Sequence, residues 1–154
     1  MHKLAEFGGV FAFLVFWHFF ADWVIQSHEE AMRKSWDHIT RAMHCAMYTV
    51  AFVPFMVLSG FTNFEGFLCM GILFGVHFIE DTYIPVALWA KYVRRAPHFW
   101  ELTEDPETGE WRLPTLMGGL KSFVEHPLGL LLAITIDQLV HIATLLPVAY
   151  YATH

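Results

Sequence analysis

The sequence predicts an all-α integral membrane protein, a polytopic transmembrane four-helix bundle with both termini on the outer side of the membrane. Composition is the first reason for this prediction. Of 154 residues, 56% are hydrophobic and 16% are charged, whereas a soluble domain averages about 45–50% apolar and about 25% charged residues. A chain this short cannot bury so much apolar surface in a single core. The other two reasons are four long apolar stretches and a one-sided distribution of basic residues.

The same composition excludes several other classes of protein. A disordered chain has low hydrophobicity, which is the opposite of what this sequence shows. A net charge of −6 with nine basic residues disfavours a nucleic-acid-binding protein. The two cysteines, Cys45 and Cys69, lie within apolar runs and provide no disulfide framework.

Four apolar stretches are each long enough to cross a bilayer, which requires roughly 20 helical residues. The first contains His18 and Asp22 and is followed by no small-residue cleavage site, so we expect a retained helix rather than a signal peptide. Together the stretches are expected to form one integral membrane domain over residues 1–154. The stretches comprise residues 7–26, 42–60, 67–89 and 128–152, and the two longer connections comprise residues 27–41 and 90–127.

The two longer connections hold eight of the nine Lys and Arg residues. Basic residues concentrate in the cytoplasmic loops of membrane proteins, so we expect both connections in the cytoplasm and a multi-pass protein of the bacterial inner membrane. Ser27 and Glu30 form a predicted capping box at the start of a short helix, and Asp37 is the expected N-cap of the next one. The connection 90–127 is expected to hold a short hairpin or an interfacial helix.

Ionisable residues inside the apolar stretches cost a few kcal/mol each on insertion scales, so they call for an explanation. Three pairs of a histidine and an aspartate lie four residues apart, a spacing that places both side chains on one face of a helix. The predicted directions of the spans put the three carboxylates in one layer and the three imidazoles in a deeper one, with His44 near the carboxylates. The pairs are His18 and Asp22, His77 and Asp81, and Asp137 and His141.

This pattern predicts a metal centre in the cytoplasmic half of the bundle. The stretches contain no Lys or Arg to neutralise the buried carboxylates, and a divalent cation would do so. Histidine nitrogen and carboxylate oxygen suit zinc foremost, or iron or manganese, and the number of candidate ligands fits one or two ions. The predicted ligands are His18, Asp22, His44, His77, Asp81, Asp137 and His141.

Neighbouring residues have predicted supporting roles, and other interpretations stay open. Gln26 and Gln138 are expected to orient the ligands through hydrogen bonds, and Glu80 is the candidate general base. A purely structural set of interhelical hydrogen bonds is the main alternative. A haem site is a weaker one because it would leave the aspartates unused. The basic residues at the cytoplasmic rim are topology signals, or some of them hold a lipid or phosphate headgroup.

A resemblance to known proteins adds to this interpretation. The sequence resembles a family of small uncharacterised membrane proteins of bacteria and phages, and more loosely the membrane-bound metal-dependent hydrolases. The resemblance covers most of the chain apart from residues 100–125, and it implies a metal-dependent hydrolase. The residues that carry it are His18, Asp22 and Gln26 in a His-x3-Asp-x3-Gln motif, then Lys34, His44, Asp137, Gln138 and His141.

The predicted function is therefore that of a metal-dependent hydrolase acting on a lipid-linked or membrane-proximal substrate. The metal would lower the pKa of a bound water and so supply hydroxide as the nucleophile. The alternatives are a metal-ion or proton transport or binding protein and a structural accessory subunit of the membrane. The outer halves of the stretches are nearly all apolar, which favours a one-sided pocket over a continuous path. The bilayer is the expected partner, and a homo-oligomer is compatible with the sequence.

Overall fold

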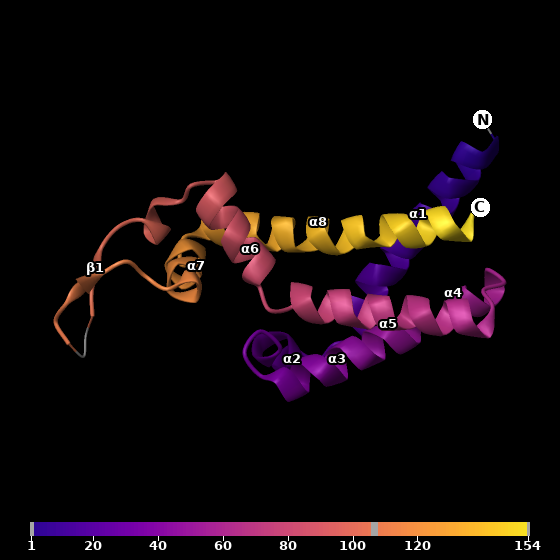
Figure 1. The fold of residues 1–154 in the computed structure, drawn as a ribbon, viewed down its shortest axis with the longest axis horizontal. Coiled ribbons are helices and arrows are strands. Elements are labelled where there is room, and N and C mark those ends of the chain that lie inside the picture. Colours follow the sequence, from indigo (N-terminus) through magenta and orange to yellow (C-terminus); the bar gives the residue numbers. More distant parts are fainter. Residues whose placement is uncertain (1, 106–107, 154) are drawn as a thin grey trace. The chain divides into compact units, whose positions relative to one another are not determined.

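The computed structural model describes residues 2–105 and 108–153, which are mostly helical (Figure 1). The chain divides into two compact units. The first unit comprises Met1–Thr82 and His141–His154, and the second comprises Tyr83–Val140. Helix α8 (Pro127–Ala152) contributes residues to both units.

The first unit is built from apolar helices. Helices α3 and α5 pack side by side (Figure 1). The buried core of this unit includes Leu14, Tyr48, Phe52, Leu73 and Leu145. Its elements are α1 (His2–Phe19), a π-helical segment η1 (Phe20–Val24), α2 (His28–Arg33), α3 (His38–Ala51), α4 (Val53–Leu58), α5 (Asn63–Glu80) and the end of α8.

Local side chains explain where two of these helices begin. At α2 the Ser27 hydroxyl accepts from the Glu30 N–H, and the Glu30 carboxylate accepts from the Ser27 N–H, which confirms the predicted capping box. These hydrogen bonds, foremost that from the Ser27 backbone, lower the pKa of Glu30. Asp37 accepts from the Ile39 N–H and begins α3, which confirms the predicted N-cap.

The third apolar stretch is interrupted instead of forming one continuous helix over residues 67–89. Helix α5 ends at Glu80, and α6 (Ile84–Leu88) begins after a turn. Tyr83 takes a left-handed backbone conformation with φ 58°, which is strained for a bulky residue. Pro85 lacks an N–H and its ring would clash with the carbonyl four residues earlier, so it cannot continue the helix. The break leaves Asp81 at the end of α5.

The second unit has its own small core. Val86, Ala90, Phe99, Leu120 and Phe123 are buried in it. Its elements are α6, a π-helical segment η2 (Trp89–Val93), a 3₁₀ turn (Pro97–Phe99), a hairpin of β1 (Thr103–Glu104) and β2 (Trp111–Arg112), α7 (Leu116–Val124) and the start of α8. Gly119 allows α7 to approach Phe99, because a Cβ atom there would lie 2.5 Å from the phenyl ring.

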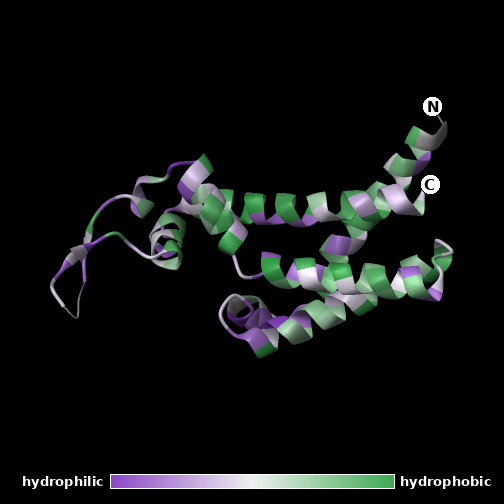
Figure 2. Ribbon diagram, in the orientation of Figure 1, coloured by the Kyte–Doolittle hydropathy of each residue, from purple (hydrophilic) through white to green (hydrophobic). Residues whose placement is uncertain are grey.

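Three helical segments among the described residues are long and apolar enough to cross a membrane: Leu4–Val24, His38–Leu58 and Pro127–Ala152. Asn63–Glu80 and Ile84–Val93 meet the same criterion together as a pair bent by 50°, which is the geometry of a broken span or of a re-entrant loop. Apolar residues dominate these helices (Figure 2), and many are exposed, such as Leu58 at 85% and Phe67 at 80%. So much exposed apolar surface is compatible with a membrane protein.

Candidate metal centre

Two overlapping groups of buried ligand atoms surround His77 in the first unit. We call Asp22, His44, His77 and Asp81 the four-ligand group. His77, Glu80 and His141 are the three-ligand group. Within each group the ligand atoms all lie within 4.8 Å of one another, so each buried cluster could hold a metal ion.

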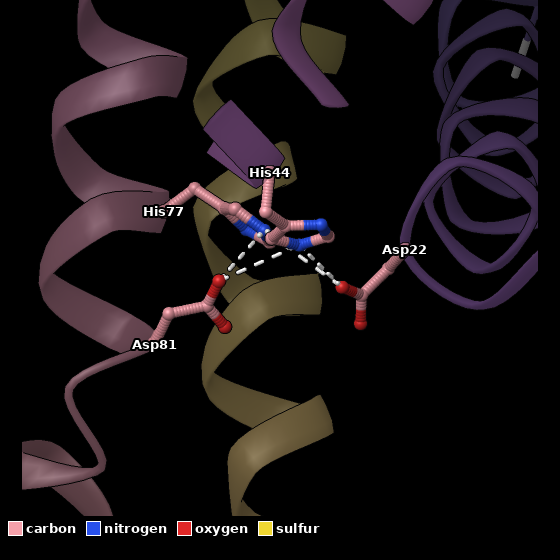
Figure 3. Close-up of side chains that lie close together, drawn as sticks. All are labelled: Asp22, His44, His77 and Asp81. Carbon is pink, nitrogen blue, oxygen red and sulfur yellow. Dashed lines mark hydrogen bonds and ion pairs between the residues drawn. The ribbon is translucent and has the colours of Figure 1, made fainter. Parts of the chain in front are cut away.

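The helices bring the four-ligand group together from distant parts of the chain (Figure 3). Asp22 lies in the π-helical segment η1, a type of irregularity that is frequent at functional sites. His44 lies on α3 and His77 on the last turn of α5. Asp81 lies four residues after His77, and the two side chains share one face as the spacing predicts.

Distances within the four-ligand group approach those of a tetrahedral metal site. His44 Nε2 lies 3.1 Å from His77 Nε2 and 3.0 Å from Asp22 Oδ1. Asp81 Oδ2 lies 3.4 Å from each of these two Nε2 atoms, and Asp22 Oδ1 lies 3.8 Å from His77 Nε2. Four ligands bound to zinc at about 2.0–2.1 Å lie about 3.3 Å apart. A small cation between these atoms would therefore need only small side-chain adjustments.

The three-ligand group lies on two helices, α5 and α8. His141 Nε2 lies 3.6 Å from Glu80 Oε2, and its ring meets the His77 ring edge to face, with centroids 4.7 Å apart. Two histidines and one glutamate form a ligand set that leaves a fourth position for water in catalytic zinc sites. Glu80, the predicted general base, is thus buried beside His141.

Lys34 corrects the expectation that no basic residue pairs with the buried carboxylates. Its ammonium lies 3.1 Å from Asp22 Oδ1 and 2.9 Å from Asp81 Oδ1. It also lies 3.4 Å from His44 Nε2. Lys34 is outside the apolar stretches, at the C-terminal end of α2, but its side chain is buried and reaches the cluster. The protein itself therefore supplies, through Lys34, a positive charge that compensates part of the negative charge of the carboxylates.

Arg41 holds the backbone beside Lys34. Its Nε donates to the Lys34 carbonyl at 2.7 Å, and its Nη2 donates to the Ser35 carbonyl at 2.6 Å. The Arg41 guanidinium is buried and lies over the Phe78 ring at 5.0 Å. The segment that carries Lys34 is therefore fixed to α3.

Tyr48 is a further residue that sequence reasoning missed. Its ring stacks on His77 with centroids 3.8 Å apart and planes 2° from parallel, which holds the imidazole in place. Its hydroxyl lies 3.1 Å from His18 Nδ1 in a hydrogen bond. His18 stacks on His141 at 5.5 Å and lies outside both ligand groups. His18 thus contacts the centre through Tyr48 and His141.

The remaining predicted residues lie beside the groups or in the other unit. The Gln26 amide nitrogen lies 3.2 Å from His44 Nδ1, so Gln26 orients a ligand ring. In the second unit the Gln138 amide donates to the Asp137 carboxylate at 3.3 Å. Asp137 is buried but belongs to neither ligand group.

A comparison with protein families matches residues 10–103 to DUF3307, described as proteins of unknown function. The chain belongs to this family. The matched segment of DUF3307 contains the whole four-ligand group and Lys34, whereas His141 follows it. Membership agrees with the resemblance to an uncharacterised family. No curated protein and no solved structure matches the chain.

Proposed function

We propose that this protein is an integral membrane protein that binds a divalent transition metal through Asp22, His44, His77 and Asp81. The observation that carries the proposal is a group of four buried ligand atoms that all lie within 4.8 Å of one another, with five of their six distances between 3.0 and 3.8 Å. Two histidine nitrogens and two carboxylate oxygens suit zinc, iron or manganese, and four ligands at tetrahedral spacing favour zinc.

The charges of the cluster also support a cation. The Asp22 and Asp81 carboxylates carry two negative charges, and the Lys34 ammonium compensates one of them. Glu80 adds a further carboxylate nearby. An ion of charge +2 would offset both aspartate charges, of which the ammonium offsets only one, and this lowers the cost of burying the carboxylates.

In the proposed topology four spans form a bundle with both termini outside, and the broken segment Asn63–Glu80 with Ile84–Val93 is one of the spans. Asp22 and Asp81 come late in spans that run inward, and His44 comes early in a span that runs outward. All three then lie near the cytoplasmic face, on the side of the basic connections. This location would give the metal access to the cytoplasm and to lipid headgroups.

For the reaction we propose hydrolysis of a lipid-linked or membrane-proximal substrate. A metal held by four protein ligands has no open position, so hydrolysis requires the ion to bind through His77, Glu80 and His141 with water as the fourth ligand. The metal would lower the pKa of this water, and a carboxylate beside it would accept the proton. The closed four-ligand arrangement by itself favours the second candidate, a metal-binding or transport protein without chemistry.

The test is the metal content of the purified protein, measured by mass spectrometry of the elements. Wild type is expected to carry a stoichiometric transition metal, and His44→Ala and Asp22→Asn are expected to lose most of it. His98→Ala is the matched control, because His98 lies in the second unit and in neither ligand group. A wild-type protein that binds no transition metal, even when one is supplied, would refute the proposal.

A further inference from the structure

The Lys34 ammonium and a bound metal would use the same atoms. In the structure the ammonium contacts Asp22 Oδ1 at 3.1 Å and His44 Nε2 at 3.4 Å. Both atoms belong to the four-ligand group. A lone pair that a metal uses is no longer available to an N–H donor in the same direction.

Distance strengthens this conflict. A metal bound to Asp22 Oδ1 would lie about 2.0–2.2 Å from that oxygen. Because the ammonium is 3.1 Å from the same oxygen, the two cations would lie no more than about 5.3 Å apart. Like charges at such a separation disfavour each other strongly when both are buried. The ammonium and the metal are therefore not expected to occupy the cluster together.

We propose that Lys34 is a tethered cation that occupies the metal centre in the absence of metal and is displaced when a metal ion binds. This inference rests on the proposed metal centre. Metal loading is then an exchange of cations, in which the two carboxylates are paired before and after. The exchange lowers the affinity for metal relative to a site without the ammonium. It also favours divalent over monovalent ions, because only a divalent ion adds positive charge to the cluster when it replaces the ammonium.

The displacement needs a side-chain movement and no unfolding. Arg41 holds the carbonyls of Lys34 and Ser35, so the backbone stays in place. The four-carbon stem of a lysine can swing its ammonium toward water while the stem remains against apolar surface. Lys34 lies between α2 and α3, on the connection that the distribution of basic residues assigns to the cytoplasm.

The first test compares Zn²⁺ affinities by competition with a chromophoric chelator. Lys34→Met is expected to raise the affinity by about tenfold or more, the scale on which one nearby charge shifts an ionic equilibrium. Arg33→Gln is the matched control, because Arg33 is the preceding residue, is half exposed and pairs with Asp37 outside the cluster. An affinity that is unchanged or lower in Lys34→Met would overturn the exchange and make Lys34 a support of the site.

The second test uses the wild-type protein and does not depend on how well a variant folds. An amine-reactive label is applied with and without Zn²⁺, and peptides are quantified by mass spectrometry. Labelling of the buried Lys34 is expected to rise several-fold with Zn²⁺, while Lys91 and Lys121 serve as internal references. Equal labelling of Lys34 while Zn²⁺ is bound would overturn the exchange. If neither wild type nor Lys34→Met binds Zn²⁺, the proposed metal centre is wrong and the exchange fails with it.

A cavity in the second unit carries an independent inference. Its volume is about 230 Å³, and it is lined by Arg94, His98 and His126 together with apolar residues that include Phe123 and Leu132. The His98 and His126 rings lie 5.8 Å apart. The cavity reaches the first turn of α8, where backbone N–H groups are without helical partners. A cationic side chain and N–H donors beside apolar walls suit a phosphate group that is attached to an alkyl chain.

Tyr92 and Trp100, which belong to the same unit as the cavity, indicate its depth in a membrane. The Lys91 ammonium lies over the rings of Tyr92 and Trp100, at 5.5 Å and 5.2 Å. Tyrosine, tryptophan and lysine concentrate where the bilayer meets water. We infer that the cavity binds the phosphate of an anionic headgroup, with the apolar wall toward the acyl chain.

Thermal stabilisation of the purified protein by phosphatidylglycerol in mixed micelles, and separately by inorganic phosphate, tests this inference. Stabilisation by phosphatidylglycerol that is lost in Arg94→Gln and kept in Arg95→Gln would assign a lipid. The same pattern with inorganic phosphate would assign a free phosphate ion. Arg95 is the matched control because it is the next residue, is exposed and does not line the cavity. Stabilisation that is absent in wild type or unchanged in Arg94→Gln would overturn the inference.

Discussion

The two ligand groups that share His77 differ in ways that bear on function. The four-ligand group combines residues of η1, α3 and the C-terminal end of α5, is already contacted by the Lys34 ammonium and lies wholly in the segment that matches the family. The three-ligand group depends on His141, beyond that segment, and has a ligand set that leaves room for water. The four-ligand group is suited to binding a cation, and the three-ligand group is suited to catalysis by a cation with a bound water. Variants that separate the two groups therefore separate metal binding from hydrolysis.

The largest effect is expected for His77→Ala. His77 belongs to both groups, so its loss should reduce metal content to near zero and abolish any hydrolysis. Metal content of the purified variant is the measurement, with His98→Ala as the control for a general loss of histidine. A His77→Ala protein that retained a full complement of metal would show that neither group is the binding site.

Glu80→Gln should separate the groups. Glu80 lies beside His141 and outside the four-ligand group, so the variant should keep the metal of that group. Hydrolysis of a model phosphodiester or ester lipid should fall at least about 100-fold, because the three-ligand group loses its carboxylate ligand and even a residue that only orients a ligand contributes about 10–100-fold. Asp22→Asn, which changes a ligand of the four-ligand group only, should instead lose metal from that group. If wild type carries metal but hydrolyses no lipid ester or phosphodiester, the binding or transport function is favoured.

A smaller effect is expected at Gln26. In the structure the Gln26 amide nitrogen lies 3.2 Å from His44 Nδ1. Metal binding at Nε2 needs the proton on Nδ1, so the amide must turn and present its oxygen. Gln26→Leu removes this acceptor and should weaken metal binding by about 10–100-fold. Gln26→Glu supplies a permanent acceptor and should bind at least as tightly as wild type. Equal affinities for all three proteins would exclude an orienting role.

The smallest effect is expected at Asp37, which begins the helix that carries His44. Hydrogen bonds, foremost from Thr40, lower the pKa of Asp37, so the ionised carboxylate is the form that stabilises the folded state. Its contribution is complete above the ordinary carboxyl range and is lost as the pH falls through the lowered pKa. Asp37→Ala should lower the melting temperature slightly at neutral pH, with metal content unchanged. At acid pH the difference from wild type should vanish. A difference that persists there would assign the effect to something other than the carboxylate.

How much of the centre was predictable depends on whether the contacts are local. The spacing of His77 and Asp81 predicts a shared face, and that face forms because helical geometry alone brings such residues together. The same argument applied to His18 and Asp22 does not make His18 a member of either group, and between these two residues the helix changes to π geometry. The sequence predicts no break at Asp81, although Pro85 was a signal that could have indicated one.

Lys34 and Tyr48 show what the sequence pattern could not reveal. Lys34 reads as a surface residue because Glu30 lies four residues before it, yet its long side chain turns into the cluster. Nothing in the periodicity of α3 distinguishes Tyr48 from an ordinary core aromatic residue. Both roles arise from contacts between elements that are distant along the chain, and such contacts leave no local signature.

By itself the sequence determined the helical class, the apolar character of the helices, the two helix caps and the presence of buried histidine and aspartate residues. These features follow from composition and from interactions over at most four residues. Only the tertiary structure decided which of those residues meet, that a lysine already stands among them, and that His77 joins two groups. The physical reason is that a binding site is defined by distances of about 3 Å between atoms on different helices, which helix packing sets and spacing along one helix does not.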